Sequence, residues 1–171
     1  MSEARKYFGK YRGTVVNNVD PEQRGRLMVM VPDVSGFALT SWALPAFPWG
    51  GMQMGMFSVP LIGAGVWVEF EQGNLDYPIW VGVYFGSAAE VPALAHLIPP
   101  AIPGIVFQTV LQNSILLSDV PGPTGGIMLK STTGAMILIN DLGITISNGQ
   151  GAMIQMTGPS VVINAGALTV I

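Results

Sequence analysis

The last third of the chain consists of repeats that are punctuated by glycine. Gly126 and Gly143 lie 17 residues apart in the sequence, and so do Gly134 and Gly151. Each copy holds two short aliphatic runs separated by Gly, Ser, Thr or Asn, a pattern that predicts two strands and two turns. A third and shorter copy begins at Ser160 and runs to the end of the sequence.

Charge is almost absent from this repeat region. Of the 7 basic and 10 acidic residues in the chain, only Asp119, Lys130 and Asp141 follow Glu90. A repeat of this kind buries its apolar face only against neighbouring repeats or against partner chains. The repeats therefore predict a rigid β-fibre that is built from several copies of the chain.

The whole composition favours an all-β protein. Half of the 171 residues are hydrophobic and 10% are charged, well below the roughly 25% that is usual in soluble domains. With 22 Gly and 13 Pro, long helices are disfavoured and turns are frequent. The chain has no Cys, which excludes disulfides and thiolate metal sites. The net charge of -3 argues against a nucleic-acid partner.

Residues 1–88 have the pattern of a small barrel. Alternating apolar residues predict five strands, separated by glycine and proline turns. In the second of them Leu27, Val29 and Val31 share one face, while Met28 and Met30 share the other. Five strands in about 80 residues suit an OB-fold barrel. The predicted strands cover residues 11–17, 26–32, 42–48, 66–71 and 79–84, and the proline-marked third is expected at a sheet edge.

Residues 89–104 form a Pro-rich connector, and residues 105–171 form the needle repeats. Pro99, Pro100 and Pro103 predict extended, semi-rigid backbone in the connector. Prolines and glycines also interrupt both long uncharged stretches of the chain, so neither stretch can form the roughly 20-residue apolar helix that spans a bilayer.

Strand alternation places ten apolar residues of the repeats on one face. Three chains that turn these faces inward would form a dry core, so the ten are the predicted trimer core of the needle. They are Ile127, Leu129, Ile137, Ile139, Ile144, Ile146, Ile154, Met156, Val161 and Ile163.

Residues 11–86 resemble the OB domain of the central spike protein of contractile injection systems. That family includes phage baseplate assembly protein V, the T4-like spike and the VgrG proteins of type VI secretion. The likeness rests on four segments in the family's order, and the repeats resemble its triple-stranded β-helix needle through Gly-x-x-Ile-x-Ile-Asn-Asp141. The barrel segments begin with Gln23-Arg-Gly-Arg-Leu, Ser41-Trp-Ala-Leu-Pro, Phe57-Ser-Val-Pro and Tyr77-Pro-Ile-Trp.

The resemblance implies a homotrimer whose C-terminal strands join into a single β-prism. It implies a separate hub protein on the barrel side, because only about ten residues precede the barrel where many relatives carry a hub domain. It also implies a small conical PAAR-like tip protein at the needle end, docked on Leu168, Val170 and Ile171. Some short phage spikes end in a His-x-His metal tip, whereas the one histidine here is His96, in the connector.

No group of residues indicates an active site, a cofactor or a metal. Glu69, Glu71 and Asp76 could be drawn as an acid cluster, but carboxylates on a barrel surface usually serve solvation. His96 has no metal-ligand spacing around it. A cell-wall hydrolase is disfavoured as well, because the short connector leaves no room for the lysozyme domain that some family members insert.

Two further surface features remain open in the sequence. Basic and aromatic residues alternate in residues 5–12, as they do in OB folds that bind single strands. The alternative function is therefore a single-strand nucleic-acid-binding module with an oligomerising tail.

Trp67 and Trp80 are interpreted as facing outward toward a neighbouring protomer. The methionines are interpreted mainly as filling cores and subunit contacts, with a soft recognition surface as the alternative: Met28, Met30, Met52, Met54 and Met56.

The sequence thus predicts a non-enzymatic, trimeric spike at the centre of a phage-like baseplate, one that punctures the target envelope when a sheath contracts. The target membrane would be contacted only mechanically, and no nucleic acid would be bound. The N-terminus carries charges and no apolar segment, so we expect synthesis in the cytoplasm without a signal peptide. Assembly into a phage tail or a tail-like injection particle would follow.

Overall fold

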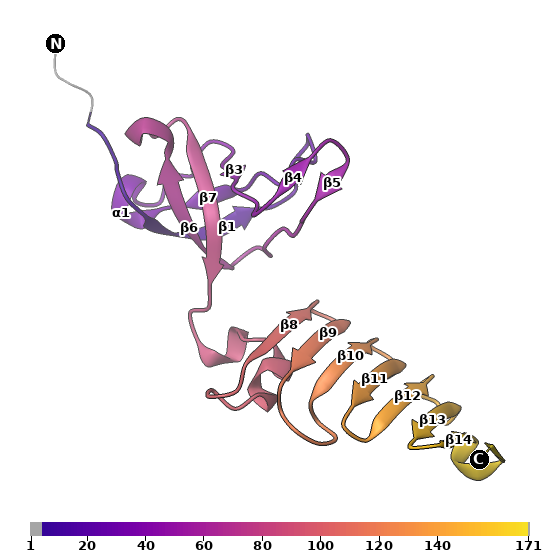
Figure 1. The fold of residues 1–171 in the computed structure, drawn as a ribbon. Helices are drawn as coiled ribbons and strands as arrows, with labels where there is room; N and C mark the ends of the chain where they lie inside the picture. Colours follow the sequence, from indigo (N-terminus) through magenta and orange to yellow (C-terminus); the bar gives the residue numbers. More distant parts are fainter. Residues whose placement is uncertain (1–4, 171) are drawn as a thin grey trace. The chain divides into compact units, whose positions relative to one another are not determined.

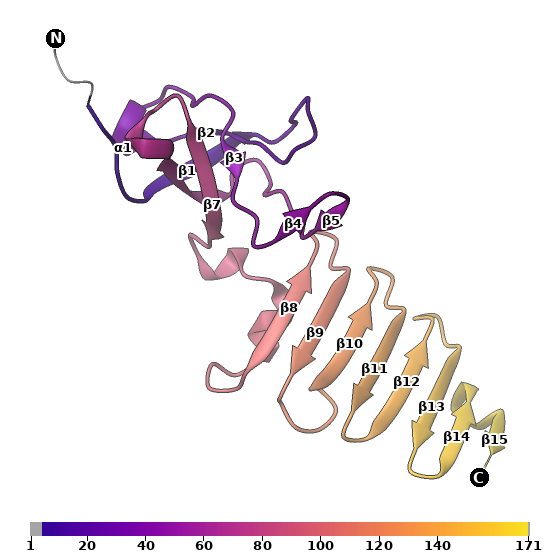
Figure 2. The ribbon, with the colours of Figure 1, turned by 45° about the horizontal axis from the view of Figure 1, so that its top comes forward.

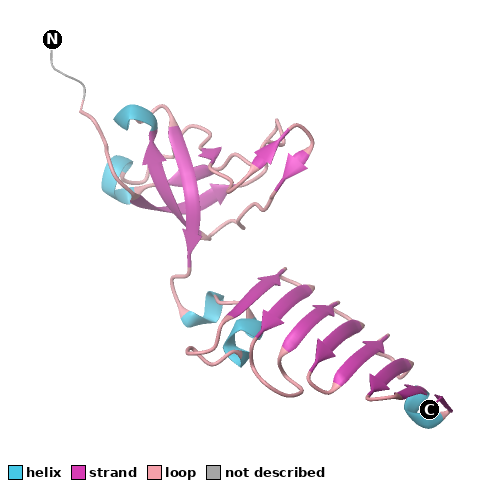
Figure 3. Ribbon diagram, viewed as in Figure 1, coloured by secondary structure: helices cyan, strands magenta, loops and turns pink. Residues whose placement is uncertain are grey.

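A computed structural model describes residues 5–170 and divides the chain into two compact units, Met1–Ala88 and Ala89–Ile171. Strands dominate both units, and the helices are short (Figure 3). The prediction of an all-β chain is confirmed.

The first unit is a curled sheet of five strands (Figure 1). Their order is β2-β1-β6-β7-β3, with the predicted third strand at an edge and parallel to β7. Backbone hydrogen bonds between Leu27 and Ala43, with N···O distances of 3.1 and 2.7 Å, join the two edges and close the curl. The elements are β1 (Tyr11–Asn17), β2 (Met28–Met30), α1 (Pro32–Ser35), β3 (Leu44–Pro45), β4 (Gly50–Gly51), β5 (Met54–Gly55), β6 (Gly65–Phe70), η1 (Glu71–Gly73) and β7 (Pro78–Tyr84).

The interior of the curl holds the apolar face that the alternation predicts. Leu27, Val29 and Val31 are completely buried, whereas Met28 and Met30 on the other face are half-buried. Val66 and Val68 from β6 complete this core, together with other apolar side chains of β1 and β7. Each buried side chain of this size contributes about 1.5–3 kcal/mol, so the barrel has a core made within one chain.

The prediction that Trp80 faces outward is wrong. Trp80 lies opposite Val68 in the register of β6 and β7, and directly opposed residues share a face of the sheet. Its ring is therefore buried, and its Nε1–H donates to the carbonyl oxygen of Gly25 at 3.0 Å. The register shifts between Trp67 and Val68, a bulge that alternation within a single strand does not reveal.

A buried carboxylate organises the turn between β1 and β2. Asp20 accepts hydrogen bonds from the backbone N–H groups of Glu22, Arg24 and Arg26, at 3.0, 2.8 and 3.2 Å. It also accepts from Nε and Nη2 of Arg26, at 3.0 and 2.6 Å, and that guanidinium stacks on Trp42. The Arg26 guanidinium, aided by the three N–H groups and opposed by burial, holds the pKa of Asp20 well below its usual range.

The second unit is a single antiparallel sheet of eight strands in sequence order (Figure 2). Each predicted repeat supplies two neighbouring strands, as expected. The strands are β8 (Gly104–Gln108), β9 (Ser114–Ser118), β10 (Gly126–Lys130), β11 (Met136–Asn140), β12 (Gly143–Ser147), β13 (Met153–Thr157), β14 (Ser160–Ile163) and β15 (Leu168–Val170), with η4 (Asn164–Gly166) between the last two.

The connector is not the extended strap that its prolines predict. It contains η2 (Ala88–Glu90) and η3 (Ala93–Leu97), and Pro92 immediately precedes the second of them. At residues 99–102 the backbone turns instead of extending, since the N–H of Ile102 donates to the carbonyl oxygen of Pro99 at 2.9 Å. The fixed φ of Pro100 suits the second position of such a turn, which is why the prediction of an extended strap from the prolines is wrong there.

Candidate functional site

An apolar ladder runs along one face of the needle sheet. We define it as two columns of side chains that oppose one another across successive strands. The strand register places all ten predicted core residues on this one face. The first column is Ile105, Leu117, Ile127, Ile139, Ile144, Met156 and Val161, and the second is Phe107, Ile115, Leu129, Ile137, Ile146, Ile154, Ile163 and Leu168.

The ladder is only partly covered within one chain. Ile127 is 47% exposed and Ile139 is 43% exposed, although each lies in a strand that is paired on both sides. A continuous apolar strip of this length is far larger than the scattered apolar residues that ordinary surfaces carry. The ladder is therefore the surface of the needle that most requires a partner.

Sequence analysis missed the first four members of the ladder. Ile105, Phe107, Ile115 and Leu117 extend both columns into the β8–β9 hairpin. In these strands the alternate positions, Val106 and Leu116, are apolar too, so no alternation marks the face. The signal that could have found the four is their spacing of two from one another, read together with the repeats that follow.

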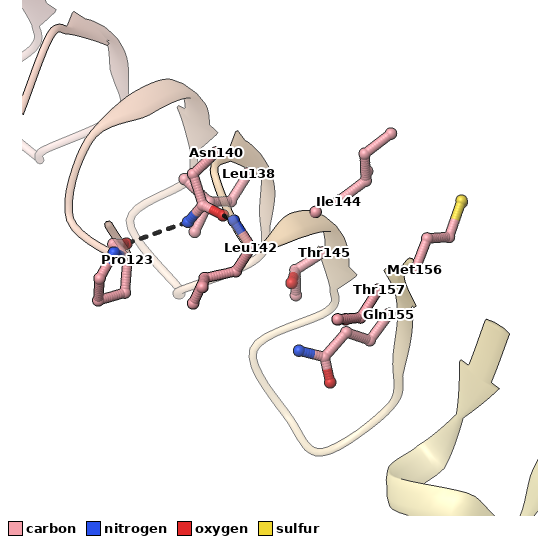
Figure 4. A pocket seen from close by; sticks show the side chains of 10 residues that line it. Pro123, Leu138, Asn140, Leu142, Ile144, Thr145, Gln155, Met156 and Thr157 are labelled. Carbon is pink, nitrogen blue, oxygen red and sulfur yellow. Dashed lines mark hydrogen bonds between the residues drawn. The ribbon is translucent and has the colours of Figure 1, made fainter. Parts of the chain in front are cut away.

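The opposite face of the sheet is covered differently along its length. At the first strands it packs against the connector: the backbone N–H of Leu94 donates to the Gln108 side chain at 3.4 Å, and Leu116 is buried. In β12 and β13, the middle residues of the strands, Thr145 and Gln155, lie on this opposite face. Figure 4 shows Ile144 and Met156 pointing to one side of the sheet, and Thr145 and Gln155 to the other.

A shallow pocket lies on this opposite face, beside the β9–β10 loop (Figure 4). The side-chain amide of Asn140 donates to the carbonyl oxygen of Pro123 at 3.2 Å, and Asp141 accepts from the N–H of Gly122 at 2.8 Å. These bonds fasten the loop over the sheet. None of the residues that line the pocket is titratable, so the pocket offers no acid or base.

A glycine begins the first strand of the first and second needle repeats, at Gly126 and Gly143. Gly126 has φ +90° and Gly143 has φ +135°. A Cβ on Gly126 would lie 2.0 Å from the Ile139 carbonyl oxygen, and one on Gly143 would lie 1.9 Å from that of Met156. The 17-residue spacing of these glycines thus reflects a close backbone approach that recurs between the same strands of each repeat.

The predicted tip-docking residues fall at the end of the sheet. Leu168 lies opposite Ile163, is 54% exposed, and forms the last described step of the ladder. Val170 ends β15, but its side chain lies outside the described part of the chain, and so does residue Ile171.

The titratable residues that the sequence raised as candidates lie in separate places. Glu69 pairs with Lys10 on the barrel surface, and Glu71 begins η1 after the strand has ended. His96 lies in η3 of the second unit. Within residues 5–170, no three His, Asp or Glu side chains come together as a possible metal site. Among the same residues, no helix is both long enough and apolar enough to cross a membrane.

A closed OB-type sheet, followed by a β-sheet with one uncovered apolar ladder, defines an OB-fold protein with a β-structured oligomerisation domain. Residues 11–85 match the family described as the type VI secretion system/phage-baseplate injector OB domain. Residues 104–169 match the phage baseplate V C-terminal trimerisation domain. The chain belongs to the phage baseplate V and spike family.

Family membership gives this molecule a structural role in a baseplate spike, and its trimerisation domain makes it a homotrimer. A search of curated proteins found no significant match to the chain. The ladder and the trimerisation domain occupy the same residues, so sequence similarity and surface chemistry indicate the same part of the chain.

Proposed function

We propose that this protein is the central spike of a phage-like contractile injection system, which pierces the target envelope when the sheath contracts. It performs no chemistry: the work comes from the sheath, and the spike concentrates the force on a narrow end. The observation that carries the proposal is the uncovered apolar ladder in a trimerisation domain.

Three ladders facing one axis would form the needle core. Completing the burial of a half-exposed aliphatic side chain contributes on the order of 1 kcal/mol, or about half of the value for full burial. Summed over ten positions, this is on the order of 10 kcal/mol per chain, comparable to the whole stability of a small domain. Assembly and folding of the needle would therefore be coupled.

Stiffness follows from the direction in which the strands stack. The eight strands lie side by side along the sheet, so a spacing of about 4.8 Å gives a needle of roughly 34 Å. Bending such a needle would stretch the backbone hydrogen bonds between strands on one side. Many bonds would have to lengthen at once, which suits a part that transmits a compressive load.

The two ends of the spike would meet different proteins. A separate hub would hold the barrel side, and a small conical tip protein would sit on the apolar end formed by Leu168, Val170 and Ile171. The exposure of Leu168 at the last described strand supports an apolar seat there. The assembled particle would be a phage tail or a tail-like injector.

The solution mass of the purified chain tests this proposal. We expect a mass close to three times the 18.1 kDa of one chain. A variant that ends after Gly86 should be monomeric, because it retains the barrel core and loses the ladder. A stable full-length monomer would overturn the trimeric spike, since the ladder would then need no partner.

A further inference from the structure

A hairpin of methionine and glycine projects from the barrel. We name residues 49–57 the methionine hairpin; they include β4 and β5, and Figures 1 and 2 both show these strands extending from the side of the curl. Met52 is 96% exposed, and Met54 and Phe57 are also largely exposed. No charged residue lies between Asp33 and Glu69, and Gln53 is the one residue with a polar side chain among the hairpin's methionines and glycines.

The hairpin buries few of its own side chains: Phe57, at its base, contacts the Phe47 ring with the ring centroids 5.4 Å apart, whereas Met52 is almost fully exposed. Its two strands pair through Gly50 and Gly55, and a Cβ on Gly55 would lie 3.0 Å from the Cα of Gly50. The ribbon is therefore thin and presents its thioethers outward. Methionine side chains are flexible and polarizable, and they contact aromatic rings favourably.

The outer face of the barrel sheet carries a matching surface. Arg12, Trp67 and Tyr84, from three adjacent strands, form what we name the aromatic platform. The two rings lie 5.1 Å apart, and the Arg12 guanidinium sits 5.8 Å from the Trp67 ring and 5.7 Å from the Tyr84 ring. All three side chains are thus held in place before any partner arrives.

Two glycines keep the aromatic platform open. A Cβ on Gly65 would lie 2.6 Å from the Tyr84 ring, so that ring can settle over β6 only because position 65 has no side chain. Gly82 lies opposite Trp67 in the register, where it places no side chain over the indole. The sheet therefore leaves both rings partly exposed on its outer face.

We propose that the methionine hairpin of one copy packs on the aromatic platform of the next copy around the trimer. This inference rests on the trimeric spike proposed above. Each barrel carries one hairpin and one platform, so a head-to-tail contact repeated three times would close a ring. The trimerisation domain tethers the three barrels through short connectors, which raises their effective concentration to about the millimolar range.

The charges around the aromatic platform favour a protein partner over a nucleic acid. Single-strand binding requires free cations that track the phosphates. Lys10, the neighbouring cation on this face, is paired with Glu69, whose carboxylate would repel a phosphate backbone. An uncharged methionine surface needs no such cations. Each contact between a thioether and an aromatic ring would stabilise its packing on the platform by about 0.3–1.5 kcal/mol.

Cross-linking between two differently tagged full-length chains tests the contact. The natural chain has no cysteine, so a Met54→Cys chain and an Arg12→Cys chain can be co-expressed and treated with a short bismaleimide. We expect covalent dimers that carry both tags. As the matched control, Met54→Cys paired with Asp33→Cys, another surface residue of the barrel, should give few. Trimers of either single variant alone should also remain uncross-linked.

The outcomes separate this contact from the spike itself. The mixed trimers could have the normal mass and yet give no more cross-linked dimer than the Asp33→Cys control. This result would contradict the contact between hairpin and platform but not the trimeric spike. A monomeric wild-type chain would overturn the spike first. Binding of a labelled oligo-dT to the wild-type trimer that is lost in Trp67→Ala would assign the platform to nucleic acid and so overturn the contact.

Discussion

Asp20 shows how one side chain holds a long turn. Its carboxylate accepts from three backbone N–H groups and from the Arg26 guanidinium, so neutralising it leaves several donors without their partner. Removing one partner of a buried ion pair strongly destabilises the fold, because the other charge is then left buried and unpaired. The turn between β1 and β2 therefore depends on this residue far more than on its neighbours.

We expect Asp20→Asn to lower the urea midpoint of the barrel by several times the effect of Glu22→Gln. Glu22 is the matched control because it lies in the same turn and its own side chain is 54% exposed, although it pairs with both Arg24 and Arg26. Unfolding of the full chain would be followed by tryptophan fluorescence. Equal effects of the two substitutions would show that the turn does not depend on Asp20.

The pH dependence of this difference has a definite sign. The pKa of Asp20 is depressed in the folded chain. Its contribution to the free energy of unfolding is therefore fully present at a pH above its pKa in the unfolded chain, which is about 3.9. As the pH falls from there toward the folded pKa, the unfolded chain binds the proton more readily and the contribution is lost. The difference in urea midpoint between the wild type and Asp20→Asn should therefore become smaller below about pH 4.

At the scale of elements, the needle strands show what alternation can and cannot predict. All ten predicted core residues share a face because residues two apart in a strand lie on one side of the sheet, and the antiparallel register carries that side from strand to strand. The hairpin β8–β9 precedes the glycine-spaced repeats and is apolar on both faces, so neither a repeat nor an alternation identifies its ladder residues. Its second face is covered by the connector, a tertiary contact that no local pattern encodes.

The barrel shows the same limit. Its strands and its buried face were predictable from alternation, yet Trp80 was assigned to the wrong side because its orientation depends on pairing with Val68 across a bulge. The aromatic platform was missed for a related reason. Arg12, Trp67 and Tyr84 lie far apart in the sequence, and only the sheet register brings them together.

A pair of adjacent residues in β12 tests which face of the needle turns inward. We expect Ile146→Asp to abolish trimer formation, since three unpaired carboxylates would be buried near one axis at a penalty of several kcal/mol each. Thr145→Asp is the control, because Thr145 lies on the opposite face of the same strand. Size-exclusion chromatography with light scattering would measure both. A stable Ile146→Asp trimer together with a monomeric Thr145→Asp would reverse the assignment.

At the scale of the whole molecule, the two units bury their apolar surface in different ways. The barrel has side chains that are completely buried within one chain, whereas the needle leaves its apolar ladder partly exposed. If the ladder is buried only between chains, the stability of the needle must depend on protein concentration and that of the barrel core need not.

Two spectroscopic probes can follow the units separately. All four tryptophans lie in residues 42–80, so indole fluorescence reports the barrel, while far-ultraviolet circular dichroism reports both units. A tenfold dilution shifts a trimer equilibrium by about 2.8 kcal/mol per trimer, because two association steps are each worth about 1.4 kcal/mol. We therefore expect the guanidinium midpoint of a circular-dichroism transition to fall on dilution.

Trp49 lies in the methionine hairpin and Trp67 in the aromatic platform, so both are replaced by Phe to remove the reporters in the proposed contact between copies. The fluorescence of this Trp49→Phe, Trp67→Phe variant should hold its midpoint over the same dilution. The barrel core would then be stable alone, and the needle stable only as a trimer. Two probes that report one coincident, concentration-independent transition would contradict this division. A needle folded without partners would follow, and the ladder would need another explanation than a trimeric core.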